Sequence, residues 1–308
     1  MVTTRFIKGH GTGNDFVILP DDRSAAAPSA REIRWLCDRR FGIGGDGLLR
    51  ALPAGDVPQW DGDPDLWFMD YYNADGSVAQ MCGNGLRVFA RFLRTEGLID
   101  GDEAEVATRS GAKRVRLFDD GTVRAELGPV QVGDELVSIS TSGQSQQARP
   151  ADVGNPHAVV VLDGHESVTE MDLSSAPVWS PAEAFPEGVN VEFVRQVGRT
   201  HVQMRVFERG VGETLSCGTG TVAVAAVMAR RTGDLGPWRV DVPGGRITVD
   251  LAQSQNGEVL ASLTGPAVLV AQGEVHIPDE AVSRGPLSAS HRISPSVTWL
   301  PHTTSGTR

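Results

Sequence analysis

Short, mostly apolar runs separated by Gly, Pro and Asp recur along the 308-residue chain. Runs of this length and spacing are typical of strands in antiparallel sheets that close or nearly close. In the first half, the runs that predict strands are Thr4–Lys8, Phe16–Leu19, Asp65–Tyr72, Ala104–Arg109, Lys113–Phe118 and Thr122–Leu127. In the second half they are His157–Leu162, Val189–Arg195, His201–Glu208, Trp238–Val242, Arg246–Leu251, Glu258–Thr264 and Ala267–Ala271. The small and polar residues at Gln144–Gln147 predict a surface loop.

Helical periodicity is confined to three segments, at about residues 29–40, 83–96 and 218–232. The first is amphipathic and begins after Ser29, a residue type favoured at helix N-caps. In the second, apolar residues cover more than one face, and the third is apolar nearly all round, a pattern typical of a helix buried on all sides. We therefore expect an α+β fold in which each half of the chain wraps a barrel-like, mostly antiparallel sheet around a central helix.

Both predicted central helices begin with the same motif. Cys82-Gly83-Asn84-Gly85 precedes the first, and Cys217-Gly218-Thr219-Gly220 precedes the second, 135 positions later. A polar residue stands nine positions before each cysteine, Asn73 in the first copy and Glu208 in the second. A weaker match, 141 positions apart, joins the pairs Gly13-Asn14 and Gly154-Asn155. This repeat predicts two pseudo-symmetric domains with a cleft between them.

A cysteine at the start of a helix has a defined chemical setting. The first helical amides have no partner within the helix, and the aligned peptide dipoles add about half a positive charge there. This setting favours a thiolate, with a pKa below the free value of about 8.5, and it also binds carboxylates. Two facing copies would hold one α-carboxylate and place a sulfur on each face of the α-carbon. One thiolate could then remove the α-proton while the opposite thiol delivers another, which inverts the centre.

Polar residues near these motifs could bind the charged ends of an amino acid. The candidates are Asn73, Asn155, Asn190, Glu208 and Arg209. Taken alone, each asparagine is typical of a turn, and His157 is typical of a structural histidine. A redox disulfide between Cys82 and Cys217 is a rival use of the same pair. A metal site is disfavoured because no further ligands stand at the usual spacing.

Composition narrows the class of protein. The 39 acidic and 28 basic residues give a net charge of −11, which argues against nucleic acid or an anionic membrane surface as the main partner. The sequence has neither an apolar run of about 20 residues nor an apolar signal core near its first residue, so a cytoplasmic location is expected. From about residue 278 the chain changes to Ser, Pro, His and Gly, which predicts a mobile tail over residues 278–308.

The sequence also bears on cofactors. The only lysines are Lys8 and Lys113, and neither stands in a setting that suggests a Schiff base with pyridoxal phosphate (PLP). The glycine-rich segments 9–15 and 39–47 lack the complete phosphate-binding patterns. Cys37 lies in the amphipathic helix and is expected to pack in the core. We expect a reaction that needs no cofactor and no metal.

Several segments together resemble the diaminopimelate epimerase family, whose members use two cysteines and no PLP. The matching segments are Lys8–Phe16, Arg40–Gly47, Asn73–Arg87, Gly154–His157, Gly188–Glu192 and Phe207–Gly220. They run in the family's order to about residue 277. The resemblance implies interconversion of LL- and meso-diaminopimelate in lysine and peptidoglycan-precursor biosynthesis. It also implies a homodimer and two barrel-like domains, residues 1–119 with 264–277 and residues 120–263.

The resemblance assigns roles to individual residues. It implies that Cys82 is the proton donor and Cys217 the acceptor in the LL-to-meso direction, with His157 and Glu208 assisting near the reacting centre. It implies that the α-carboxylate is held by Gly83, Asn84, Gly218 and Thr219. It implies further substrate contacts from Asn14, Asn73, Asn155, Asn190 and Arg209, the last recognising the distal L-centre together with Glu208.

The chain departs from the family at two places. Many members have Gln where this chain has Gly47, and the tail after residue 277 exceeds the family pattern. Two rival functions remain: a two-thiol racemase of proline or hydroxyproline type, and a binding protein with a switchable disulfide. Glu208, Arg209 and the asparagines favour a long substrate with a second zwitterionic end, which argues against a cyclic imino acid.

Overall fold

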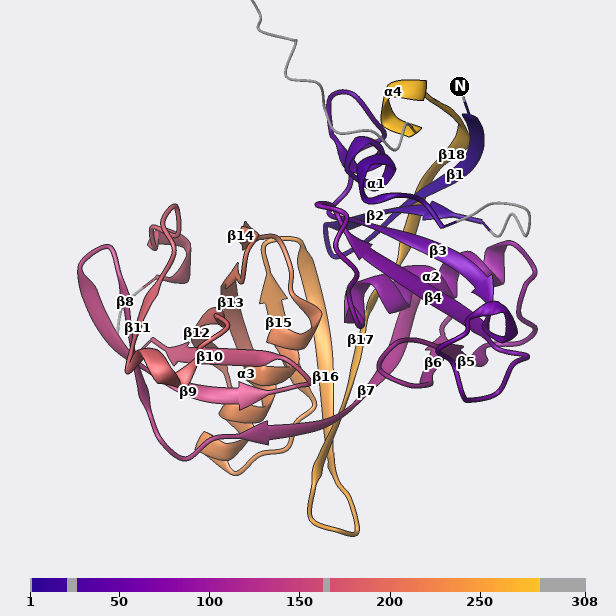
Figure 1. The fold of residues 1–308 in the computed structure, drawn as a ribbon. Helices are drawn as coiled ribbons and strands as arrows, with labels where there is room; N and C mark the ends of the chain where they lie inside the picture. The colour runs from indigo at the N-terminus through magenta and orange to yellow at the C-terminus, as the bar shows by residue number, and fades with distance from the viewer. Residues whose placement is uncertain (1, 21–26, 163–166, 283–308) are drawn as a thin grey trace, which may run out of the picture.

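The computed structural model describes residues 2–20, 27–162 and 167–282. Eighteen strands in these ranges are hydrogen-bonded into one continuous sheet, which forms two lobes (Figure 1). The strands of the first lobe are β1 (Val2–Gly11), β2 (Asn14–Leu19), β3 (Gly47–Pro53), β4 (Trp67–Asn73), β5 (Glu103–Ala107) and β6 (Lys113–Leu117). Two more strands are shared between the lobes, β7 (Thr122–Val132) and β17 (Val259–Pro266). β18 (Val268–Ile277) follows β17 and returns to the first lobe.

The second lobe contains the remaining strands and one central helix. Its strands are β8 (Val137–Thr141), β9 (Gln144–Asp152), β10 (Pro156–Val161), β11 (Val178–Ser180), β12 (Asn190–Gly198), β13 (His201–Glu208), β14 (Gly212–Thr214), β15 (Trp238–Val242) and β16 (Gly245–Gln253). The helices of the chain are α1 (Ala30–Cys37), α2 (Gly83–Thr95), α3 (Gly218–Thr232) and α4 (Asp279–Val282). Short 3₁₀ turns lie at Ala54–Asp56, Val168–Glu170 and Ala182–Ala184. None of the helices described is long and apolar enough to cross a bilayer.

The two lobes repeat one order of strand pairing. In the first, β1–β2 is antiparallel, β2–β3 parallel, β3–β4 antiparallel, β4–β5 parallel, and β5–β6–β7 antiparallel. In the second, β9–β10 is antiparallel, β10–β12 parallel, β12–β13 antiparallel, β13–β15 parallel, and β15–β16–β17 antiparallel. The pseudo-symmetry that the sequence repeat predicted is therefore present in the strand topology.

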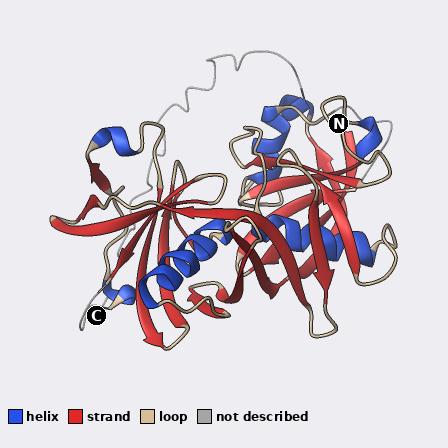
Figure 2. Cartoon of the chain, turned by 90° about the horizontal axis from the view of Figure 1, so that it is seen from below, coloured by secondary structure: helices blue, strands red, loops and turns tan. Residues whose placement is uncertain are grey.

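Both sheets close into barrels through the shared strands. The first residues of β7 pair with the end of β17, and the chain then continues into β18, which pairs with β1. The last residues of β7, Gln131 and Val132, pair with β9 and close the second barrel. Figure 2 shows α2 and α3 enclosed by strands of their own lobes. The predicted fold class is thus confirmed, whereas the exact domain division remains a prediction, because β7 and β17 belong to both barrels.

Both central helices are buried over most of their length, α3 with side chains that are apolar on nearly every side and α2 with a broad apolar face beside Arg87, Arg91 and Arg94. In α2, the side chains of Leu86, Val88, Phe89, Phe92 and Leu93 are all fully buried. In α3, the residues from Val222 to Ala229 are mostly Ala and Val, and none of them is more than 7% exposed. Both helices belong to one hydrophobic core that runs through the two lobes. Burial of such side chains is the main favourable term in folding.

The structure corrects several details of the sequence-based prediction. Gln144–Gln147 is not a loop but the first part of β9, which forms a hairpin with β8 across Ser142 and Gly143. These two residues have φ of 46° and 83°, the left-handed pair that a two-residue hairpin turn requires. The strand was missed because its outer residues are polar and exposed. β3 was missed as well, and α1 ends at Cys37 rather than at residue 40.

The segment that begins at residue 278 is partly described. Its first residues form α4, and Ala281 of this helix is buried in a small core with Ile33 and Leu36 of α1. The predicted mobile tail otherwise falls on residues 283–308, which lie outside the described residues.

Candidate active site

Each repeated cysteine occupies the N-cap of a central helix. Cys82 has an extended backbone, and its Sγ accepts a hydrogen bond of 3.4 Å from the amide of Gly85. Cys217 has the same conformation at the start of α3, with a 3.4 Å bond from the amide of Gly220. Both thiols are free rather than joined in a disulfide. The sequence-based prediction of two cysteines at helix mouths is confirmed in this respect.

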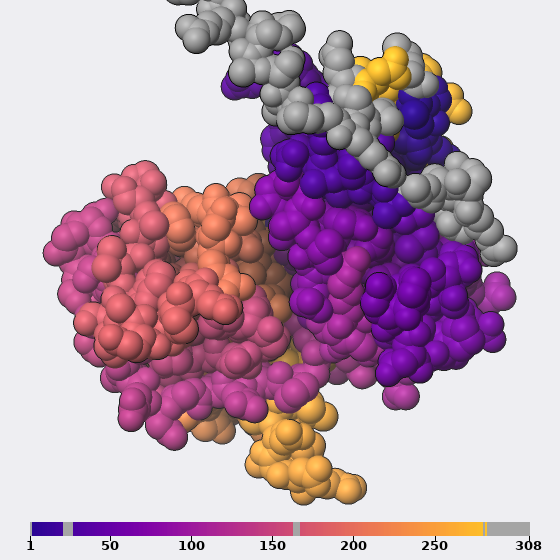
Figure 3. Space-filling model, in the orientation of Figure 1, coloured from indigo at the N-terminus to yellow at the C-terminus, as the bar shows by residue number. Residues whose placement is uncertain are grey.

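The N-termini of the two helices meet between the lobes. A Cβ placed on Gly218 would lie only 3.2 Å from the amide nitrogen of Asn84 and 3.3 Å from Cα of Gly83. The Asn84 side-chain amide donates to the carbonyl oxygen of Ser216 at 3.0 Å. Figure 3 shows a furrow between the two lobes on the surface of the molecule. The first residues of both helices therefore lie in direct contact.

A second contact between the lobes lies beside these helices. Thr12, in the turn between β1 and β2, donates through Oγ1 to Oγ of Ser216 at 2.8 Å. A Cβ on Gly244, in the turn between β15 and β16, would lie 1.7 Å from the carbonyl oxygen of Thr12. Both Thr12 and Ser216 are buried, 1% exposed each. The close approach of these two turns fixes the distance between the lobes at the helix mouths.

Asparagine side chains surround Cys82. Its thiol donates to Oδ1 of Asn14 at 3.6 Å, and the side-chain amide of Asn84 donates to the same oxygen at 3.3 Å. Asn14 in turn donates to the carboxylate of Asp46 at 2.8 Å. Oδ1 of Asn84 is buried and has no hydrogen-bond partner among the described residues. Because an unsatisfied buried acceptor is costly, this oxygen is suited to accept from a ligand group.

A chain of polar side chains leads away from Cys217. Its Sγ lies 3.5 Å from Oγ1 of Thr219, and Asn155 donates to that hydroxyl at 3.4 Å. Nε2 of His157 lies 3.1 Å from Oδ1 of Asn155, and Nδ1 lies 2.7 Å from Oε1 of Glu192. His157 and Glu192 are both fully buried. Among the described residues, hydrogen bonds connect His157 to the thiol through Asn155 and Thr219.

The chain matches the sequence model described as diaminopimelate epimerase over residues 6–133 and 150–270. The chain belongs to the diaminopimelate epimerase family. Three relatives that carry this name support the assignment. The one from Streptomyces coelicolor is 46% identical over 87% of this chain and 94% of its own length. Those from Thermobifida fusca and Corynebacterium glutamicum are 46% and 42% identical, over 89% and 90% of this chain and 98% and 99% of their own lengths.

Solved structures of proteins with other names share the fold. A phenazine biosynthesis protein of the PhzF family from Bacillus anthracis superposes with a TM-score of 0.70 at 17% identity, over 90% of this chain and all of its own. A probable proline racemase from Agrobacterium radiobacter gives a TM-score of 0.65 at 16% identity, over 89% and 93%. A hydroxyproline epimerase from Agrobacterium vitis gives 0.64 at 17% identity, over 89% and 92%. At these identities the likeness bears on the fold alone.

The pKa values of Cys82 and Cys217 are higher than the sequence predicted. Burial raises the pKa of Cys82 to about 11, and hydrogen bonds from the amides of the first helical turn only partly offset it. Burial and the nearby carboxylates of Glu208 and Glu192 raise the pKa of Cys217 well above its usual range. The expected lowering was wrong because loss of hydration outweighs the helix N-terminus. Burial also raises the pKa of Glu208 to about 7, against a hydrogen bond from the hydroxyl of Thr214.

The remaining predicted residues lie at the ends of nearby strands. Asn73, the last residue of β4, accepts from the hydroxyl of Tyr71 at 3.1 Å. Asn190, the first residue of β12, pairs in register with His157, and its Oδ1 accepts from the backbone amide of Arg209 at 2.9 Å. The side chain of Arg209 is exposed and donates to the carbonyl of Glu187. No described hydrogen bond joins Asn73, Asn190 or Arg209 directly to a cysteine.

Gly47, where many family members have Gln, has little space for a longer side chain. A Cβ at this position would lie 2.7 Å from the carbonyl oxygen of Tyr72 and 2.8 Å from Cε2 of Tyr71. The ring of Tyr71 therefore occupies the space that a longer side chain at position 47 would need. Desolvation, followed by the charges of Cys82 and Glu208, raises the pKa of Tyr71 well above its usual range, which places its hydroxyl in the electrostatic surroundings of the site.

Four functional candidates escaped the sequence analysis: Thr12, Tyr71, Glu192 and Ser216. Glu192 carried a usable signal, because it is a lone carboxylate inside an apolar run, as His157 is a lone imidazole inside another. A buried charge of this kind requires a partner. Thr12 and Ser216 carried none, since their contact joins segments that are far apart in the sequence.

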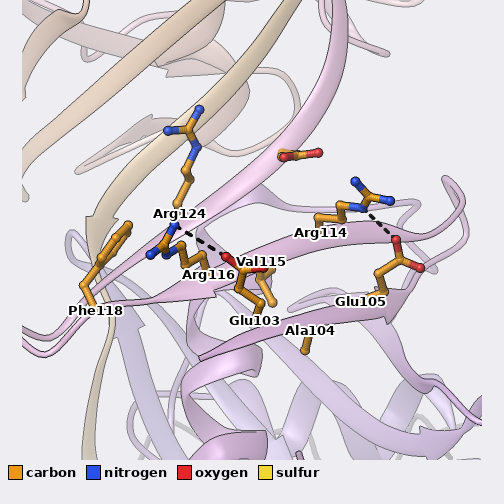
Figure 4. A pocket seen from close by; sticks show the side chains of 9 residues that line it. Glu103, Ala104, Glu105, Arg114, Val115, Arg116, Phe118 and Arg124 are labelled. Atoms are coloured by element: carbon orange, nitrogen blue, oxygen red, sulfur yellow. Dashed lines mark hydrogen bonds and ion pairs between the residues drawn. The ribbon is translucent and has the colours of Figure 1, made fainter. Parts of the chain in front are cut away.

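A hollow on the outer wall of the first barrel is chemically different from this site. It has a volume of about 500 Å³ and is lined by charged residues of β5, β6 and β7 (Figure 4). Arg114 pairs with Glu105 at 2.8 Å, and Arg116 lies 3.5 Å from Glu103. These groups largely neutralise one another across neighbouring strands and are exposed to water, so we treat this surface as a ladder of ion pairs rather than a binding site.

Proposed function

We propose that this protein is a diaminopimelate epimerase that interconverts the LL and meso isomers by a two-base thiol mechanism. The observation that carries the proposal is the contact between the two helix N-termini, each of which begins with a cysteine. The names of the family relatives supply the substrate. The long, two-ended substrate also agrees with the polar side chains on both sides of the furrow.

In the proposed reaction, the substrate α-carboxylate binds between the two helix mouths. The amides of Gly83 and Asn84 approach from one lobe and those of Gly218 and Thr219 from the other. In the LL-to-meso direction, the thiolate of Cys217 takes the α-proton and the thiol of Cys82 delivers its proton to the opposite face. One C–H bond breaks and another forms, and the two sulfurs exchange protonation states. Preorganised amides stabilise the carboxylate as negative charge develops on it.

The raised thiol pKa values suit this chemistry. A thiolate whose conjugate acid has a high pKa is a stronger base, which the weakly acidic α-proton requires. The substrate ammonium would compensate the charge of the thiolate in the closed site, and Oδ1 of Asn84 could accept a hydrogen bond from a donor on the ligand. Binding would thus add a positive charge on the substrate side of the sulfurs.

We assign the other predicted residues supporting roles. Asn14, Asn73 and Asn155 would bind polar groups of the substrate, and Asn190, Glu208 and Arg209 would recognise its distal zwitterionic end. His157 would act as a positioning residue, because it holds Asn155 from a fully buried place. Glu208 would also assist proton transfer, since its pKa of about 7 lets it exchange protons near neutral pH.

The family resemblance supports three further parts of the proposal: a reaction without cofactor or metal, a cytoplasmic enzyme, and a homodimer. Among the described residues, no group of three or more His, Cys, Asp or Glu side chains could hold a metal ion. Exposed Val268 and Val270 on β18 offer an apolar surface for a second copy. Light scattering on the purified full chain would measure the mass in solution and test the dimer.

The activity can be tested by incubating the reduced protein with LL-diaminopimelate and following stereoisomer composition by chiral chromatography. The expected result is a mixture of LL and meso isomers, and no inversion with Cys82→Ser or Cys217→Ser. Absence of meso product from the folded wild-type protein would refute the proposal. Turnover of hydroxyproline instead would select the rival racemase, and full activity of either single variant would refute the two-base assignment.

A further inference from the structure

Arg87, in the second turn of α2, is a fully buried cation whose hydrogen-bond partners among the described residues are all neutral. Its side chain is 0% exposed. Its guanidinium donates to the carbonyl oxygens of Gly83 and Pro266, both at 3.5 Å, and to Oγ1 of Thr12 at 3.4 Å. Among the ion pairs of the described residues, none includes Arg87. A buried charge without a counter-ion is rare and costly in proteins.

The charge of this side chain persists at neutral pH. Burial lowers the pKa of Arg87 to about 10, which still leaves the guanidinium protonated at pH 7. The hydrogen bonds to Gly83, Pro266 and Thr12 are long, so they compensate only part of the lost hydration. The fold therefore retains a positive charge in its interior that none of the described side chains neutralises.

The position of Arg87 connects it to the proposed carboxylate cradle. It donates to the carbonyl of Gly83, the first residue of α2, and its hydrogen bond to Thr12 leads directly to Ser216 of the other lobe. A Cβ on Gly11 would lie 2.9 Å from Nη2 of Arg87 and 3.2 Å from the carbonyl oxygen of Asn84. The cation thus lies directly behind the helix mouth that Cys82 caps.

The second lobe places the opposite charge behind its own cysteine. The repeat aligns Arg87 with Val222 of α3, which carries no charge. The buried acidic group in this lobe is instead Glu192 of β12, and a Cβ on Gly220 would lie 2.6 Å from its Oε1. Burial raises the pKa of Glu192, and the contact with His157 opposes that rise and favours the carboxylate. Oε2 of Glu192 has no hydrogen-bond partner among the described residues, while Oε1 contacts His157. The two pseudo-equivalent thiols therefore differ in the charge that lies behind them.

We propose that Arg87 is a positioning residue that serves as the buried counter-charge for anions at the mouth of α2, and that Glu192 opposes an anion at the mouth of α3. In the free enzyme, Cys82 then ionises more readily than Cys217. In the donor and acceptor roles assigned above, the form with the Cys82 thiolate is the one that accepts the meso isomer. The consequence for catalysis rests on the proposed function, but the difference between the two thiols does not.

Other charged and titratable groups also act on the two sulfurs. Glu208 of β13 raises the pKa of both thiols, and Arg87 lowers that of Cys82, whereas Glu192 raises that of Cys217. The further groups near the site are Asp46 before β3, Tyr71 of β4 and His157 of β10. Because Glu208 acts on both thiols in the same direction, Arg87 and Glu192 are the charges that separate them.

The test measures the rate at which iodoacetamide alkylates each cysteine as a function of pH, with peptide mass spectrometry to distinguish the sites. In the wild-type protein, Cys82 should reach half-maximal reactivity at least one pH unit below Cys217. In Arg87→Met, the midpoint for Cys82 should rise by about one unit or more, a tenfold slower reaction at fixed pH, while that for Cys217 stays unchanged. Arg87→Lys, which keeps the charge, should largely restore the wild-type midpoint.

Glu192→Gln provides the mirror-image measurement. It should lower the midpoint for Cys217 and leave that for Cys82 in place. Equal midpoints in the wild-type protein would overturn the proposal, even if Arg87→Met does not fold. An equal shift of both thiols in Arg87→Met would also overturn it, because that is the result of a general loss of packing. None of these readouts uses diaminopimelate, so failure of the proposed activity is a separate outcome.

Discussion

The contact between Gly244 and Thr12 allows the geometry of the site to be perturbed without touching a proposed catalytic group. In Gly244→Ala, the new Cβ would lie 1.7 Å from the carbonyl oxygen of Thr12 and 2.5 Å from its carbonyl carbon. Both are backbone atoms, so a side-chain rotation cannot relieve the overlap. An acceptable contact of about 3.2 Å requires the two turns to separate by roughly 1.5 Å, a typical response to overpacking.

This separation would open the site where the two helix mouths meet. A misplacement of about 1 Å can reduce the rate of a preorganised reaction about 100-fold, so we expect kcat/KM of Gly244→Ala to fall at least that far. The expected loss of stability is smaller, about 1–3 kcal/mol, because the turn lies at the edge of the core. The assay combines initial rates of epimerisation with thermal unfolding of the same preparation.

Gly257→Ala is the matched control. Gly257 lies in the turn between β16 and β17 with φ of 83°, and a Cβ there would meet no atom within 4 Å. This substitution should lower the unfolding free energy by about 1 kcal/mol, because alanine is disfavoured in a left-handed backbone conformation. It should leave kcat/KM unchanged. If Gly244→Ala retains the wild-type kcat/KM while folded, the contact between the lobes does not set the catalytic geometry, and that reasoning is refuted.

Three further predictions follow from the surroundings of the site. Because burial raises the pKa of Glu208 from 4.5 to about 7, its contribution favours folding below pH 4.5 and is lost as the pH rises towards 7. Between pH 4.5 and 7, the unfolding free energy of the wild-type protein should therefore fall by roughly 2–3 kcal/mol more than that of Glu208→Gln, as measured by denaturant unfolding. An equal fall in the two proteins would contradict the shift. Tyr71→Phe should raise KM several-fold with little change in stability, because Asn73 loses the 3.1 Å bond that orients it; an unchanged KM would exclude that role. Cys37, whose pKa burial raises to about 12, should resist alkylation in the folded protein at pH 8, and rapid labelling there would show that α1 opens.

The sequence allowed the repeated architecture to be predicted because its determinants are local. The apolar surface of residues 218–232 is visible in the chain itself, and so is the cysteine that precedes each central helix. Mixed pairing was harder to foresee, since the parallel partners β10 and β12 are joined only through a long connection. Polar exposed strands such as β9 carry too few apolar residues to be distinguished from a loop.

The electrostatics of the site could not be read from the sequence. The sequence shows that Cys82 begins a helix, which alone would lower its pKa. Its loss of hydration depends on how the chain packs around it, and only the folded structure reveals that this effect is larger. Likewise, His157 and Glu192 stand 35 positions apart, and their pairing follows from the register of β10 and β12.

The central claim is that two sulfurs act on opposite faces of one carbon, and isotope exchange in the first turnovers tests it most directly. The reduced enzyme is mixed with unlabelled LL-diaminopimelate in D₂O, and both isomers are recovered at low conversion. The two-base account predicts deuterium at the inverted α-carbon of the meso product, since that proton comes from the opposite, solvent-exchanged thiol, and little deuterium in the remaining LL substrate. Meso product that retains the original α-proton, or deuterium that enters both isomers equally from the start, would contradict it.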